Sequence, residues 1–502
     1  MSFSQLFCIF AGCKDFGCMK ILKNSILLLL VVLLFGACNK EEKATLTLER
    51  TALYFSSWGA PSQTIRYTAD NAHNVVVRSV SKGWAALVDH TERTITVTAV
   101  GKSNEEEEEP SHEGALMIDA MTVEGELTTY YITLYMLGKE TLLLDTEGKR
   151  ANCYVVSEMG RSYAFDATHR PDGEELATKR VAVLWTSNED IIHNTMFVDG
   201  KAEFFVNNEK NDDFVNTNAV IAAYDSADKV VWSWHLWIVD TNPLTAVENP
   251  VSGVSFMDRN LGAYRGNNEA SQEHSSIHDA YGLYYQWGRK DPFFRPYAYD
   301  TSGAESELAY TASGGYAVEK VKEVSSSVGT VDYATSHPLT FITNAACVEE
   351  DGDGVGDWLH EADNRLWNDN AKSLYDPCPY GWRVPRAEEL AKLTFAADNT
   401  ADLDTARKQY GWYLESGSER YFFSGCGYRR YMDGKVQNVN YSDAYPYNPE
   451  PWEGYYWSST ANEDGSAVSL YFDLITTRSL SHYNSAMASR RANGMQVRCI
   501  KE

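Results

Sequence analysis

Residues Thr94-Ile95-Thr96-Val97-Thr98 alternate hydroxyl-bearing and aliphatic side chains, one by one. Successive side chains of a β-strand point to opposite faces, so this stretch predicts a strand with one buried and one solvated face. Runs of the same kind surround it, at residues 45–48, 64–68, 75–77 and 130–134. β-branched and aromatic residues dominate these runs, and no helical period competes with them. We therefore expect residues 44–139 to form a β-sandwich.

A second β-rich stretch covers residues 140–250. Strand-like runs lie at 152–156, 181–185, 218–224 and 230–239, and a turn is expected at 225–228. Within the last run, Trp232 and Trp234 share one face of the predicted strand and Trp237 takes the other. Both faces must then be covered, so these tryptophans are expected in a core or a domain interface. The stretch predicts a second β-sandwich.

The amino-terminal segment has the pattern of a lipoprotein leader that ends at Cys38. Lys20 and Lys23 precede an apolar run at 26–35, and Gly36-Ala37 leads into the cysteine. Ten apolar residues span about 15 Å as a helix, half of a bilayer core, so a cleaved signal fits better than a spanning helix. We expect a signal peptide at 19–37, acylation of Cys38 and an anchor linker at 38–43, with residues 1–18 an over-extended gene start. An ordinary secretory signal or an uncleaved anchor is the alternative.

The composition narrows the classes of partner. The chain of 502 residues carries 70 acidic and 44 basic side chains, a formal net charge of −26. Because no basic cluster offsets this charge, nucleic acid and anionic lipid are not expected as partners. Aromatic residues make up 13% of the chain and are spread through short alternating runs, which favours several β-rich domains.

The C-terminal region, residues 251–502, contains five ordered blocks. They are residues 256–263 (FMDRNLGA), 281–293 (YGLYYQWGRKDPF), 376–385 (DPCPYGWRVP), 456–459 (YWSS) and 497–499 (VRC). In this order the blocks resemble the Fibrobacter succinogenes major paralogous domain family. The first β-rich domain, with Gly83-Trp84 at its middle, resembles the BACON-type immunoglobulin-like domains of Bacteroidetes surface proteins. Residues 39–43 (NKEEK) resemble the signal that sends Bacteroidetes lipoproteins to the outer face of the outer membrane.

The C-terminal resemblance implies an α+β, C-type-lectin-like fold after the mainly β N-terminal sandwiches. In that fold a helix follows the Gly-Trp-Arg-Val-Pro element, and Pro385 here precedes an amphipathic stretch at 387–393. Residues 469–474 and 494–500 are expected to be the closing strands.

The family blocks also carry two cysteines, Cys378 and Cys499, and the resemblance implies a disulfide between them. A bridge between Cys347 and Cys426 is an open alternative to free thiols, and it would leave Cys153 unpaired. A copper-binding, substrate-oxidising thiol pair is disfavoured, because no closely spaced cysteine pair is present in this region.

The best metal candidate is the acidic loop with Asp351, Asp353 and Asp357, whose alternating carboxylates and glycines suit calcium. Val355 and Ala362 stand where an EF-hand needs oxygen ligands, so a flexible acidic insertion explains the loop as well. No other cofactor is expected. With 70 acidic residues, a pair of catalytic carboxylates stays open until geometry selects one.

The resemblances imply a lipid-anchored protein on the surface of the outer membrane that binds a glycan or a host protein and is not an enzyme. Flat aromatic faces stack on the apolar faces of sugars, so the expected ligand surface is Trp452, Tyr455 and Tyr456, with core packing as the competing interpretation for the adjacent Trp457. Two alternatives stay open: an enzyme of glycan utilisation on the same fold, and a structural subunit of a fimbria-like assembly.

Overall fold

The computed structural model describes residues 43–208, 213–245, 253–267, 276–297, 305–346, 356–367, 370–395, 409–437, 453–474 and 483–502. These residues form two compact units. The first unit holds residues 43–53 and 58–135, and the second holds residues 54–57 and 136–502. Both are built mainly from β-strands, as expected for residues 44–250. Among the described residues, no helix has the length and apolar character needed to cross a bilayer.

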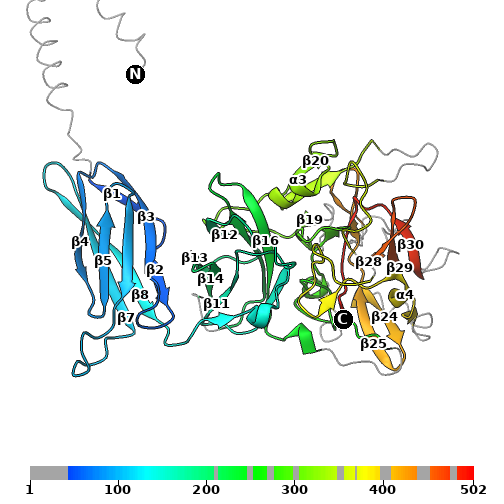
Figure 1. Ribbon diagram of the computed structural model, residues 1–502, viewed down its shortest axis with the longest axis horizontal. Helices are drawn as coiled ribbons and strands as arrows, with labels where there is room; N and C mark the ends of the chain where they lie inside the picture. The colour runs from blue at the N-terminus through cyan, green and yellow to red at the C-terminus, as the bar shows by residue number, and fades with distance from the viewer. Residues whose placement is uncertain are drawn as a thin grey trace, which may run out of the picture. The chain divides into compact units, whose positions relative to one another are not determined.

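The first unit contains two four-stranded sheets (Figure 1). One has the order β1 Thr45–Leu48, β3 Gln63–Asp70, β6 Thr94–Ala99, β5 Trp84–Asp89. The other has the order β2 Ala52–Phe55, β8 Leu127–Met136, β7 Glu113–Met121, β4 Asn74–Val80. In β6, Ile95 and Val97 are fully buried, and the threonines that alternate with them are not. The alternation read in the sequence therefore places one face of β6 in the core.

The second unit begins with two more four-stranded sheets. The larger has the order β10 Cys153–Val156, β16 Val230–Ile238, β15 Thr217–Tyr224, β12 Arg180–Thr186. The smaller has the order β13 Ile192–Val198, β14 Lys201–Val206, β11 Arg161–Asp166, β9 Leu142–Leu143. A short 3-10 turn, η2 Thr146–Gly148, follows β9.

Strand β16 is buried on both faces, as the tryptophan parity predicted. Trp232 and Trp234 pack into the core between the two sheets. Trp237, on the opposite face, joins a different core that it shares with the C-terminal region, where it donates from Nε1 to the carbonyl of Ala263 at 3.0 Å. Asn218 on β15 donates to the carbonyl of Gly262 at 2.8 Å. The β10–β16–β15–β12 sheet is therefore the middle layer of the second unit.

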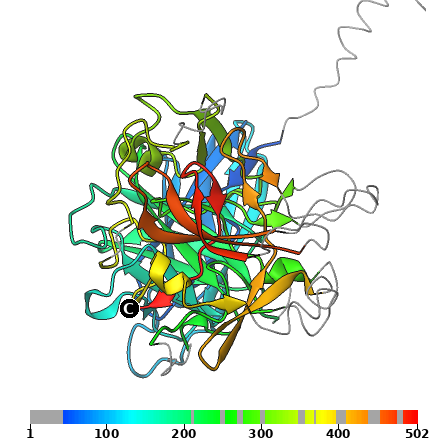
Figure 2. The same cartoon turned by 90° about the vertical axis from the view of Figure 1, so that its right-hand side faces the viewer.

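The C-terminal region consists of many short strands joined by long loops. In Figure 2 its longest sheet, β28–β29–β30, runs orange to red across the centre of the view. That sheet comprises β28 Glu453–Ala461, β29 Ala467–Asp473 and β30 Tyr483–Ser489. A four-stranded sheet comprises β17 Tyr285–Gln286, β31 Gly494–Met495, β26 Tyr428–Arg429 and β27 Val436–Gln437. A three-stranded sheet comprises β23 Thr394–Phe395, β24 Gly411–Ser416 and β25 Glu419–Ser424.

Smaller elements complete the region. The two-stranded sheets pair β18 Pro296–Tyr297 with β19 Glu305–Ser306, β20 Lys320–Glu323 with β21 Thr340–Thr343, and β22 Trp382–Arg383 with β32 Ile500–Lys501. The helical elements are η3 Pro243–Thr245, η4 Ile277–Ala280, α3 Val331–Ser336 and α4 Ala387–Leu390. The lectin-like assignment of this region stays a prediction.

Two expected elements are shorter than the sequence suggested. The helix expected at 387–393 is the single turn α4, although Leu390 and Leu393 are both buried as its amphipathic pattern required. The strand expected at 494–500 is divided into β31 and β32. Between them, the side chains of Gln496 and Arg498 are buried and donate to backbone carbonyls of other segments, in addition to backbone hydrogen bonds that this stretch makes with residues 455–457 and 257–261.

Candidate functional site

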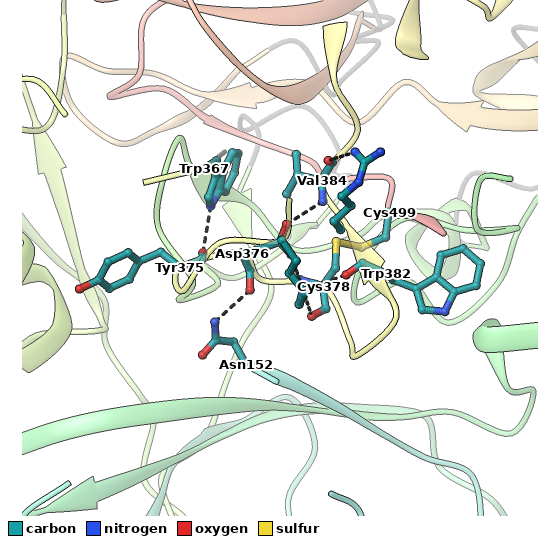
Figure 3. The surroundings of a disulfide bond; sticks show 10 residues. Asn152, Trp367, Tyr375, Asp376, Cys378, Trp382, Val384 and Cys499 are labelled. Atoms are coloured by element: carbon teal, nitrogen blue, oxygen red, sulfur yellow. Dashed lines mark hydrogen bonds and ion pairs between the residues drawn. A yellow bond between two sulfur atoms is a disulfide. The ribbon is translucent and has the colours of Figure 1, made fainter. Parts of the chain in front are cut away.

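The disulfide between Cys378 and Cys499 is present, and it is the pair implied by the resemblance. Figure 3 shows Asp376 beside it. The Asp376 carboxylate accepts from the backbone N–H of Cys378 at 2.9 Å, from that of Val384 at 2.8 Å and from Lys372 Nζ at 2.6 Å. Asn152, directly before β10, donates to the backbone carbonyl of Asp376 at 2.9 Å. The block at residues 376–385 therefore holds the C-terminal region together and attaches it to β10.

The sequence left open a second disulfide, between Cys347 and Cys426. Cys426 does not form it. Its thiol is free and fully buried, and burial raises its pKa to about 11. Cys153 is also free and buried, as that alternative required, and burial raises its pKa as well. Cys347 lies outside the described residues. Both described thiols are thus held protonated at neutral pH and away from solvent, which suits packing and not thiol chemistry.

Tyr456, expected on a ligand surface, lies in the core. Its ring is fully buried, and its hydroxyl donates to the carbonyl of Ser424 at 2.6 Å. Trp457 is also fully buried and donates from Nε1 to the carbonyl of Tyr285 at 2.8 Å, which agrees with the core interpretation. The reason is that separate apolar cores cover the two faces of β28. Trp452 lies outside the described residues.

Tyr455, also expected on the ligand surface, is buried. It belongs to a group that we call the tyrosine–carboxylate cluster: Tyr428, Glu453, Tyr455, Tyr471 and Asp473. Glu453 faces Asp473 across β28 and β29, and Tyr455 faces Tyr471 two residues further along. The Tyr455 hydroxyl lies 2.6 Å from Glu453 Oε2. The Tyr471 hydroxyl lies 2.9 Å from Asp473 Oδ2 and 3.2 Å from Glu453 Oε1. The sequence signal for this pairing was an acidic residue at the first position of β28 and at the last position of β29, two strands that also contain aromatic residues.

The electrostatics of the cluster keep both tyrosines as donors. Burial, and then the charge of Glu453, raise the pKa of Tyr455 and of Tyr471 well above the usual range. The rings also support one another, since the Tyr455 centroid lies 4.8 Å from that of Tyr428 and 5.1 Å from that of Tyr471. Each hydroxyl therefore fixes the orientation of a carboxylate, and the carboxylates in turn fix the rings.

The acidic-loop residues are not brought together among the described residues. Asp351 and Asp353 lie outside them. Asp357 is buried, accepts from the backbone N–H of Leu359 at 3.0 Å and lies 3.4 Å from Arg491 Nη1. Burial raises its pKa to about 6. In the part of the chain that the structure describes, no three His, Cys, Asp or Glu side chains gather where they could hold a metal ion.

One buried histidine was missed in the sequence. His235 on β16 lies between the middle layer and the C-terminal region, 3.0 Å from Asn218 Oδ1 through Nε2. Burial lowers its pKa to about 3, so the imidazole is neutral. It shares its strand face with Trp237, so the same parity argument places it in that interface.

Comparisons with family models and with curated proteins give no match. Among solved structures, the D00-D0 domain of intimin is 11% identical and aligns over 39% of this chain and 96% of its own, with a TM-score of 0.16. The human desmocollin-1 ectodomain is 12% identical over 43% of this chain and 45% of its own, with a TM-score of 0.14. SGBP-B from the Bacteroides ovatus mixed-linkage glucan utilization locus, solved with a heptasaccharide, is 8% identical over 37% of this chain and 42% of its own, with a TM-score of 0.12. The chain thus spans less than half the length of the last two, and these scores are too low to carry an argument about ligand or fold.

Proposed function

We propose that the protein is a lipid-anchored surface protein that binds a glycan or a host protein and does not catalyse a reaction. The proposal rests on two observations. One is the leader pattern that ends at Cys38, and the other is the hydrogen bonding of Glu453 and Asp473 to tyrosine hydroxyls inside the C-terminal region. Cys38 itself lies outside the residues that the structure describes.

The anchoring part is supported by the short distance along the chain from Cys38 to the first strand. β1 begins at Thr45, seven residues after the cysteine, and Ala44 directly before the strand is already buried. A fully extended chain of this length reaches at most about 25 Å. An acyl group on Cys38 would therefore hold the first β-sandwich within about 25 Å of the membrane surface.

The non-catalytic part is carried by one observation, the way in which Glu453 and Asp473 are held. These two carboxylates are direct partners on neighbouring strands, so they are a pair that could be considered as a catalytic dyad. Yet both are buried, and each accepts a tyrosine hydroxyl that orients it. Such a pair supports the sheet and the rings beside it, so we assign it a structural role.

This assignment is tested with the full chain after the leader, carrying Cys38→Ser to keep it in solution. We expect it to be retained on at least one polysaccharide or mucin of a panel and to release no reducing ends from any of them. Glu453→Gln and Asp473→Asn are the matched variants, since each keeps the side-chain shape and removes the charge. Release of reducing ends that both variants abolish would make the protein an enzyme, and retention on neither glycan nor host protein would contradict the binding role.

A further inference from the structure

The β-hairpin between Glu307 and Glu319 has the reverse of the usual side-chain arrangement. Ala317 N–H donates to the carbonyl of Ala309 at 2.8 Å, and Tyr310 is the antiparallel partner of Tyr316. This register places residues 307, 309, 317 and 319 on one face of the hairpin and residues 308, 310, 316 and 318 on the other. The second set, Leu308, Tyr310, Tyr316 and Val318, is called the outer hairpin face.

The inner face is made of alanines and charged groups. Ala309 and Ala317 pack into the main core of the second unit. Glu307 turns inward and forms a two-pronged ion pair with Arg295, at 2.8 and 2.6 Å. Glu319 also turns inward, where it accepts from the backbone N–H of Phe294 at 2.7 Å and pairs with Arg429. Both carboxylates that flank the hairpin are therefore neutralised inside the protein.

The outer hairpin face is apolar and open to solvent. Leu308 is 62% exposed, Tyr316 65% and Val318 70%, and Tyr310 is partly exposed. The Tyr310 and Tyr316 ring centroids lie 5.6 Å apart with 33° between the ring planes, so the two rings pack against one another on this face. Folding alone favours the opposite arrangement, with leucine, valine and tyrosine inside and glutamate outside. An exposed apolar group of this kind marks a contact surface.

The hairpin is also held firmly in place. The backbone N–H of Thr186, on β12, donates to the carbonyl of Tyr310 at 2.9 Å, and Tyr310 N–H donates to the carbonyl of Thr186 at 2.8 Å. The hairpin thus continues the edge of the middle layer near β19 (Figure 1). A rigid aromatic surface loses little conformational entropy when a ligand binds to it.

We infer that the outer hairpin face binds an uncharged polysaccharide by stacking of sugar rings on Tyr310 and Tyr316, an assignment that rests on the proposed binding function. The face contains no charged side chain, whereas the whole chain has a net charge of −26. This charge repels a second copy of the chain and anionic glycans, and it leaves neutral sugars unaffected. A stable protein partner needs about 800 Å² from roughly 20 to 30 residues on each side, far more than four side chains offer.

The test uses the full chain after the leader, again with Cys38→Ser, on insoluble neutral β-glucan, xylan and mannan, and on the anionic chondroitin sulfate and polygalacturonate. Tyr316→Ala is expected to weaken binding to the retained neutral polysaccharide by about tenfold or more, the effect of removing a central aromatic contact. Tyr316→Phe is expected to bind like the parent, since the ring face makes the contact. Tyr380→Ala, at a tyrosine 53% exposed elsewhere in the second unit, is the matched control and is expected to change nothing.

The outcomes separate this inference from the function on which it rests. Binding of a neutral polysaccharide that Tyr316→Ala leaves unchanged, or that Tyr380→Ala weakens equally, would overturn the hairpin surface and leave the binding function intact. Retention on the anionic polysaccharides alone would overturn the uncharged ligand class. Retention on no glycan, with none on host protein either, would overturn both. Because Tyr316 is exposed, its replacement is expected to leave the thermal midpoint unchanged, and this is measured alongside.

Discussion

Reduction of the Cys378–Cys499 disulfide is expected to lower the free energy of unfolding of the second unit by about 5 kcal/mol. The two cysteines are 121 residues apart, and in the chain-entropy description a cross-link over a loop of this length restricts the unfolded chain by about that amount. The same bond joins the block at 376–385 to the residue before β32, so its loss also frees both segments in the native state. The measurement is denaturant unfolding followed by tryptophan fluorescence, with and without reductant.

The control for this prediction is the double variant Cys378→Ser, Cys499→Ser. Its unfolding midpoint should match that of the reduced parent, and reductant should not move it further, because the free thiols of Cys153 and Cys426 are buried in the folded state. A parent protein whose midpoint does not respond to reductant, or a double variant that does respond, would show that the disulfide is not the source of the stability.

Trp237→Ala is expected to cost about 3 to 5 kcal/mol and to loosen both layers that meet at β16. The indole is fully buried in the shared core and donates to the carbonyl of Ala263, so truncation leaves a cavity and an unpaired acceptor. Hydrogen exchange is expected to accelerate together in β15, in β16 and in residues 283–287. Such coupled exchange would show that residues 140–250 and 251–502 depend on one another.

Trp234→Ala provides the comparison for this prediction. Trp234 lies on the same strand and is equally buried, but its ring packs between the two sheets of the second unit. Its loss is expected to accelerate exchange first in β11 and β14. If Trp237→Ala raised exchange in β15 and β16 while residues 283–287 kept their full protection, the shared core would be contradicted.

Sequence patterns predicted the strands best where one face of a sheet is solvated. The strand expected at 45–48 is β1, and the alternation at 94–98 is seen directly in the burial of β6. Parity also predicted the two-sided burial of β16. These predictions need only the two-residue period of a strand, which is a local property of the chain.

Predictions that depended on distant segments were less successful. Tyr456 was expected at a surface because nothing local shows that separate cores cover both faces of β28. The outer hairpin face was missed for the opposite reason. Leu308 and Val318 have the side chains of core residues, and only the inward ion pairs of Glu307 and Glu319 reveal that the hairpin is reversed. Contacts between residues far apart in sequence decide both cases.

The central claim, a binding protein held at a membrane by its amino terminus, is tested most directly by mass spectrometry of the amino-terminal peptide of the protein from its own cells. The account predicts a chain that starts at Cys38 and carries a thioether-linked diacylglycerol with a further acyl group, since stable anchoring needs more than one chain. An unmodified amino terminus, on protein recovered free in the medium, would contradict it.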